Sequence, residues 1–138
     1  MIYVRIVVGM TVFIAVIWAV VEQRVRRVGR VMRRELAAAG DRIELGPVRC
    51  SLRGDLPKQF DMGQLALTDR RLVFYRTVGA PIEIPRADLA SARPEKWYRH
   101  ARRFGEPHLV VTTHSGMEYG FMVKRTNRWL TALASRSS

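Results

Sequence analysis

Cysteine and histidine are scarce in this sequence, which limits the chemistry that it can carry. Cys50 is the only cysteine among 138 residues. A single cysteine excludes an internal disulfide, fits a reducing compartment, and is expected here as a small buried strand residue. The three histidines are His100, His108 and His114. Because the last two bracket one expected strand, about 20 Å apart, we expect no shared metal and place the histidines at the surface or in turns.

Other signatures of catalysis are missing as well. The sequence has no glycine-rich phosphate loop and no nucleotide motif that carries a lysine. Its carboxylates are scattered, and no local motif supplies Cys50 with a base or an oxyanion hole. We therefore expect no catalytic residue, no metal and no cofactor.

Acidic residues are few and begin late in the chain. Twelve of them stand against 24 basic residues, for a formal net charge of +12, and none precedes Glu22. A charge of this sign and size predicts an anionic partner, with anionic lipid ahead of nucleic acid.

A long apolar run opens the chain. Residues 6–21, IVVGMTVFIAVIWAVV, carry no charge. Extending the helix to residues 2–21 gives about 30 Å, the thickness of a hydrocarbon core, if Arg5 reaches up to the headgroups. Tyr3 and Trp18 lie near the two ends, where aromatic rings favour the interface. The pattern predicts a transmembrane helix; a cleaved signal peptide is the competing interpretation, but a small-x-small cleavage site fits poorly.

The charges on either side of this run predict its orientation. Only Arg5 precedes it, whereas six arginines follow it closely, namely Arg24, Arg26, Arg27, Arg30, Arg33 and Arg34. Basic residues stay on the cytoplasmic side of a membrane. We therefore expect a single-pass protein of the cell inner (plasma) membrane, with its N-terminus outside and its C-terminal domain in the cytoplasm.

The arginines also belong to an amphipathic segment. Residues 22–40 keep a helical period up to Gly40, a natural helix stop. The apolar residues fall on one arc, and most of the arginines fall on the opposite side; the arc comprises Val25, Val28, Gly29, Met32 and Leu36. Such a helix can lie along anionic headgroups, which makes the six arginines candidate lipid-binding residues. Alternatively, its apolar stripe packs on the following domain or on a second copy of itself.

From residue 41 to about 135 the pattern predicts a β domain that ends in a helix. The period changes to two, and turn residues separate the expected strands, at 47–53, 64–67, 71–76, 81–84, 89–93, 108–113 and 117–123. A helix is expected from Thr126, with Trp129 and Leu133 in the core. The fold class is therefore mainly β: a bent antiparallel sheet or barrel of about seven strands, closed by a C-terminal helix in the pleckstrin-homology (PH) order.

The stretch GQLALTDRRLVFYR at 63–76 places three charged residues between two apolar runs. Asp69, Arg70 and Arg71 resemble a ligand-binding group at first sight. However, Thr68 and Asp69 supply turn chemistry between two strands that can pair. We predict the corner of a hairpin, with Arg70 at its tip in water.

Several of these motifs resemble the GRAM and bacterial PH-like domains. The resemblance covers roughly residues 46–135 and rests on Cys50, Gly63, Leu67-Thr68, Arg71-Leu72-Val73-Phe74, Ile82-Glu83-Ile84-Pro85 and Asp88-Leu89. Cys50-Ser51-Leu52-Arg53 behind one apolar segment also resembles an uncharacterised actinobacterial family of single-pass membrane proteins. The first resemblance implies a binding module, and the second implies an architecture without an activity.

A second basic segment follows the fifth expected strand. Residues 96–104 interleave basic and aromatic side chains, and the candidates for partner or lipid contact are Lys96, Trp97, Tyr98, Arg99, Arg102 and Arg103. This mixture suits a membrane interface, a protein contact or, less well, single-stranded nucleic acid. A solvated loop is the plain alternative.

Together these patterns predict a membrane-anchored, cytoplasm-facing PH-like module without enzymatic activity. Its expected partners are the membrane itself, anionic phospholipids and an unidentified protein. A structural subunit of a membrane complex and a basic nucleic-acid-binding protein are the alternatives.

Overall fold

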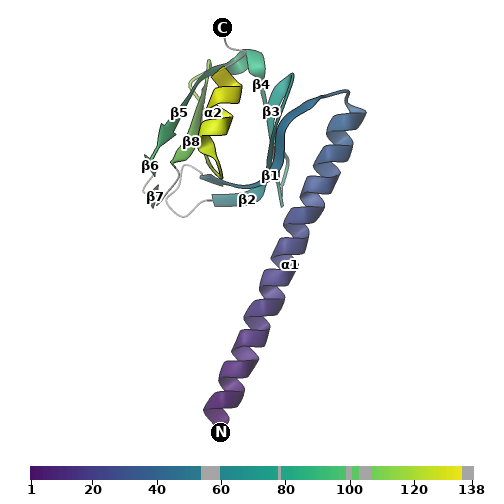
Figure 1. The fold of residues 1–138 in the computed structure, drawn as a ribbon, viewed down its shortest axis with the longest axis vertical. Helices are drawn as coiled ribbons and strands as arrows, with labels where there is room; N and C mark the ends of the chain where they lie inside the picture. Colours follow the sequence, from purple (N-terminus) through teal and green to yellow (C-terminus); the bar gives the residue numbers. More distant parts are fainter. Residues whose placement is uncertain (54–59, 78, 99–100, 103–106, 135–138) are drawn as a thin grey trace.

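The computed structural model describes residues 1–53, 60–77, 79–98, 101–102 and 107–134. Helix α1 (Ile2–Ala38) opens the chain, and helix α2 (Thr126–Ala134) closes the described part (Figure 1). Between them lie a one-turn 3₁₀ helix, Arg86–Asp88, and the strands β1 (Ile43–Arg53), β2 (Phe60–Thr68), β3 (Arg71–Arg76), β4 (Ile82–Pro85), β5 (Leu89–Glu95), β6 (Trp97–Tyr98), β7 (Ala101–Arg102), β8 (His108–Thr113) and β9 (Glu118–Val123).

Seven of the strands form one bent antiparallel sheet. Its order is β4-β3-β2-β1-β9-β8-β5, so β4 and β5 are the two edges and the sheet stays open. The mainly β fold with a long N-terminal helix, about seven antiparallel strands and a C-terminal helix is thus confirmed. The pair β6–β7, a separate hairpin of two residues a side, was not expected from the sequence, which predicts a loop there.

The main core lies between the inner face of the sheet and α2. Leu65, Leu67, Leu72 and Phe74 on β2 and β3 point into it, together with residues of β1, β8 and β9. Trp129 of α2 is 3% exposed and fills this core, as its position in the helical pattern predicts. The alternating apolar pattern therefore specifies one complete face of the sheet.

A second, smaller core lies on the outer face of β2 and β3. Ala66 and Val73 alternate with the inward residues and pack against Met32 and Leu36 of α1. Because both faces of these strands are covered, β2 is buried from residue 63 to residue 68. The apolar stripe of residues 22–38 thus packs on the domain, one of the arrangements that the sequence left open.

Helix α1 is continuous from the apolar run to this packed segment. Its 37 residues give a length of about 55 Å. The N-terminal part projects beyond the domain (Figure 1), and none of its most apolar stretch is buried. By length and composition this helix can cross a membrane. It ends in a Schellman motif: the N–H of Gly40 donates to the carbonyl of Ala37, and that of Asp41 to the carbonyl of Leu36.

The expectations for the cysteine and for the histidines have different outcomes. Cys50 is a buried residue of β1, as expected. The expectation of a surface position is wrong for His108, which is fully buried at the start of β8. Strand β5 pairs with this residue through Glu95, and the Nδ1 of His108 lies 3.1 Å from the Glu95 carbonyl oxygen. His114 is exposed, and His100 lies outside the described residues.

Candidate functional site

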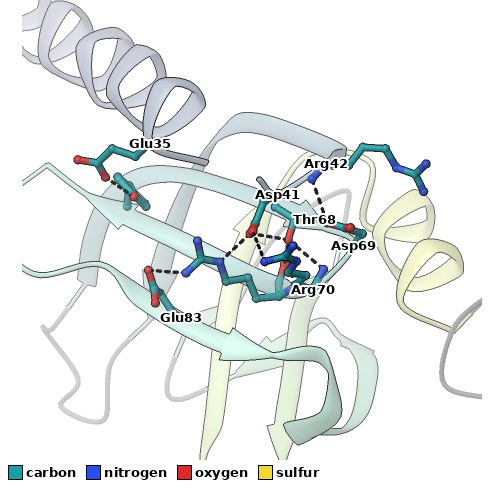
Figure 2. Close-up of polar contacts among 9 residues, drawn as sticks. Glu35, Asp41, Arg42, Thr68, Asp69, Arg70 and Glu83 are labelled. Carbon is teal, nitrogen blue, oxygen red and sulfur yellow. Dashed lines mark hydrogen bonds and ion pairs between the residues drawn. The ribbon is translucent and has the colours of Figure 1, made fainter. Parts of the chain in front are cut away.

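The hairpin corner between β2 and β3 carries a dense polar cluster, drawn in Figure 2. The strands pair as predicted, with Leu67 opposite Leu72. Asp41 enters the cluster from the end of α1, and its side chain is only 2% exposed. One of its carboxylate oxygens accepts a hydrogen bond from the Thr68 hydroxyl at 3.1 Å and another from Nε of Arg71 at 2.8 Å.

Further contacts complete this corner cluster. Arg71 also forms an ion pair with Glu83 at 3.0 Å, and Arg70 lies 3.9 Å from Asp41 while its side chain remains 63% exposed. The hydrogen bond from Arg71 to the Asp41 carboxylate raises the pKa of the guanidinium. On the outside, Asp69 accepts the backbone N–H of Arg42, which lowers the pKa of the Asp69 carboxyl. These charges are directed at one another, so the cluster joins the end of α1 to the sheet and offers no ligand site.

The six candidate lipid-binding arginines all lie on exposed positions of α1. Among the described contacts only Arg26 forms an ion pair, a long one of 4.0 Å to Glu22. The other acidic residue of this segment, Glu35, accepts a hydrogen bond from the Tyr75 hydroxyl. Burial of Tyr75, followed by this bond, raises the pKa of the phenol to about 12. The arginine face of α1 is therefore strongly positive and largely uncompensated by neighbouring side chains.

Arg49 of β1 connects the domain to the apolar part of α1. It forms an ion pair with Glu22, and its guanidinium carbon lies 5.7 Å from the ring centroid of Trp18. A guanidinium over an indole face is a favourable cation–π arrangement. Figure 1 shows how this happens: β1 runs back beside α1 and then bends away from it.

A groove lies between the arginine face of α1 and the sheet. It is lined by Gln23, Arg26, Arg30 and Arg33 on the helix and by Pro47 and Gln64 on the strands. Gln64 donates from Nε2 to the carbonyl of Val25 at 3.1 Å, which ties the helix to β2 at this level. Gly29 makes the approach possible, because a Cβ there would lie 3.2 Å from the Gln64 side chain.

The aromatic and basic segment after β5 is only partly described. Lys96 is exposed, and Trp97, Tyr98 and Arg102 belong to the backbone hairpin β6–β7. Arg99 and Arg103, the other two predicted contact residues, lie outside the described residues. Figure 1 places this hairpin on the opposite side of the sheet from α1, so the segment and the arginine face are not brought together.

Within the described residues, no group of three or more His, Cys, Asp and Glu side chains is placed to hold a metal ion. The corner cluster gathers charged side chains of both signs, and these bind one another. Binding through positive charge is the chemistry that the exposed arrangement supports.

No protein-family model matches the chain, and no curated protein matches it. Among solved structures the chain is similar to the C-terminal domain of an unknown protein from Leishmania infantum, with a TM-score of 0.60 and 20% sequence identity. The similarity covers 77% of this chain and 94% of the other. At this identity the likeness concerns the fold alone.

Sequence reasoning identified the arginine face but missed the residues that fix its place. Asp41 carries no local signal, because its partners are about 30 residues away. Arg49 falls within the expected strand 47–53, and its contacts with Trp18 and Glu22 depend on the bend in β1. One signal was present in the sequence: the apolar residues Ala66 and Val73 at outward positions indicate that something covers them.

Proposed function

We propose that this chain is a single-pass membrane protein that holds a PH-like binding domain against the cytoplasmic leaflet and reads the negative charge there. The observation that carries the proposal is the unbroken helix α1. Its exposed apolar part is long enough to span a bilayer, and its other end is packed into the domain. The domain therefore has a fixed position relative to any membrane that α1 enters.

The sheet supports a relationship with PH-like domains. If the short hairpin β6–β7 is set aside, the strands in chain order occupy the spatial order 4-3-2-1-7-6-5, followed by a helix. This order, the closing helix and the motifs around Cys50, Gly63 and Leu67-Thr68 favour the GRAM or PH-like assignment. Since such folds carry many functions, the proposal rests on charge and geometry and not on the fold.

The rise of the helix divides the six arginines into two groups. Measured from Val21 along an upright helix, Arg27 stands about 9 Å from the hydrocarbon edge, whereas Arg30 stands about 13 Å and Arg34 about 20 Å away. The headgroup layer extends about 5–8 Å beyond this edge, so it comes close to Arg27 and ends about 5 Å or more short of Arg30 and Arg34. Arg24, Arg26 and Arg27 are thus proposed to contact anionic headgroups. The remaining three arginines are left for an acidic surface on a protein partner.

A reporter fused after Ser138 tests the orientation. An enzyme that is active only in the cytoplasm should be active in this fusion, because six arginines follow the apolar run. Activity of a periplasm-only reporter would refute the orientation and, with it, the cytoplasmic site of action.

Arginine modification tests the contact with lipid. The full chain is placed in nanodiscs of phosphatidylcholine, with or without phosphatidylglycerol, and treated with phenylglyoxal before peptide mapping. Phosphatidylglycerol should slow the modification of Arg24, Arg26 and Arg27, and high salt should remove this protection. Arg42, which is 74% exposed and lies beyond the other end of the helix, is the internal control. Equal modification in both lipids would contradict the proposed reading of membrane charge.

A further inference from the structure

We propose that a basic cleft beside the bend of β1 binds the headgroup phosphate of one anionic phospholipid, taken from the membrane that α1 enters. The cleft is formed by Arg49, Lys124, Arg125 and Arg128 around Trp129, with Val48 and Met122 at its apolar rim. The inference rests on the proposed membrane location. It is distinct from the arginine face of α1, which supplies none of the cleft residues.

The fold builds the cleft from three elements that meet at one corner. Strand β1 pairs with β9 from Cys50 to Arg53, but an irregularity between Leu45 and Val48 bends the first half of β1 away. Immediately after β9, α2 begins at Thr126 and runs back across the core. The residues at the β9–α2 junction therefore face the bend of β1, with the buried ring of Trp129 between them.

The charge of the cleft is of one sign. Its lining holds four cationic side chains and no carboxylate. Lys124 and Arg128 are exposed, and neither forms an ion pair with any residue that the structure describes. Arg49 also reaches an acidic neighbour, Glu22, which lies outside the cleft. Like charges gathered in a concave surface attract an anion, and guanidinium groups bind phosphate oxygens through charge-assisted hydrogen bonds.

The position of Arg49 indicates that the anion bound in the cleft is a lipid headgroup and not a soluble anion. Its guanidinium lies over the ring of Trp18, which belongs to the apolar part of α1. If that part of α1 is in the bilayer, the β1 wall of the cleft lies at the headgroup level. The rim also exposes apolar surface, since Val48 is 37% exposed and Met122 is half-buried. A phosphate attached to a glycerol and acyl chains can use both the cations and this rim.

Arg125 offers a variant that removes charge without endangering the fold. Its φ of 59° lies in the left-handed region, where a side chain is strained and glycine is not. Arg125→Gly should therefore relieve the backbone strain at this position, while the cleft loses one of its cations.

Native mass spectrometry of the full chain in a neutral detergent tests the proposal. The protein is mixed with equal amounts of phosphatidylglycerol and phosphatidylcholine, and the fraction that carries one lipid is measured. We expect a preference for phosphatidylglycerol that falls roughly tenfold or more in Lys124→Gln/Arg128→Gln, since each basic residue contributes about 1 kcal/mol near an anionic surface. Arg125→Gly should show a smaller fall. Arg42→Gln/Arg70→Gln, which removes the same charge from exposed positions elsewhere, should keep the preference.

Several outcomes would overturn the proposal. One is equal retention of the two lipids, and another is an equal loss in both double variants, which would indicate general surface charge. A third is displacement of phosphatidylglycerol by an equal concentration of inorganic phosphate, which would show that the lipid's glycerol and acyl chains add nothing to binding and that the occupant is a soluble anion. The cleft variants should leave the phenylglyoxal protection of Arg26 and Arg27 in nanodiscs unchanged. Protection without selective lipid retention would refute the cleft alone, and loss of both would refute the proposed function as well.

Discussion

Replacing Asp41 by alanine should lower the melting temperature of the domain by about 15 °C. This carboxylate is the centre of the corner cluster that joins α1 to the β2–β3 hairpin (Figure 2). The substitution removes a hydrogen bond from a guanidinium, Arg71 Nε at 2.8 Å, and another from the Thr68 hydroxyl at 3.1 Å. It leaves Arg71 Nε without this acceptor, whereas the Thr68 hydroxyl can still donate to the carbonyl oxygen of Arg71 at 3.2 Å.

The magnitude follows from these two bonds. A bond to a charged group contributes about 1.5–3 kcal/mol and a neutral one about 0.5–1.5 kcal/mol, so the free energy of unfolding should fall by about 3 kcal/mol. Arg71 keeps its ion pair with Glu83 at 3.0 Å, which holds the loss below that of a fully broken buried pair. In a domain of this size each kcal/mol shifts the midpoint by about 4–8 °C.

The assay is thermal unfolding of the full chain in detergent, followed by circular dichroism in the range where β structure contributes. Asp69→Ala is the matched control, because it truncates a side chain of the same type in the same cluster. The Asp69 carboxylate lies on the outside, where water can take its place as the acceptor for the N–H of Arg42. This control should melt close to the natural chain. Equal shifts for the two variants, or no shift for Asp41→Ala, would refute the view that the corner cluster is structural.

Two further predictions concern the core and the outer face of the sheet. Trp129→Ala should lower the free energy of unfolding by about 3–5 kcal/mol, because a large buried ring is lost, and an unchanged melting temperature would show that α2 does not close the core. The phenol of Tyr75 should titrate near pH 12 by ultraviolet absorbance, and Glu35→Gln should bring this pKa back toward 10. Because the folded state favours the neutral phenol, the raised pKa of Tyr75 adds to the free energy of unfolding. This contribution is complete below pH 10 and is lost as the pH rises through 12. A titration unchanged by Glu35→Gln would contradict the bond to Glu35.

Local patterns predicted the elements of the fold well, because each depends on neighbouring residues. Strand β3 begins at Arg71, where the alternating pattern predicts it, and helix α2, which carries Trp129, begins at Thr126, where the helical period predicts it. Strand β1 was expected to start at residue 47 but begins at Ile43. The strand includes Gly46 and the residues before it, and its register with β2 is irregular between Ile43 and Val48.

The candidate site was less predictable, because charge is visible in a sequence and proximity is not. The six arginines stood out by composition alone. The contact of Arg49 with Trp18 and the meeting of β1 with the β9–α2 junction join residues that lie tens of positions apart. His108 shows the same limit, because its burial depends on β5 crossing beside it and not on its neighbours in the chain.

Helix α1 is unbroken between the apolar run and the domain (Figure 1). The number of residues between the bilayer and the domain therefore determines how the domain is rotated about the helix axis. Each residue added after Val21 turns everything beyond it by about 100° about the helix axis and raises it by about 1.5 Å. One added residue would therefore direct a different wall of the domain at the headgroups and carry the basic cleft away from them. Seven added residues would return the cleft to within about 20° of its original direction, at a greater height above the bilayer.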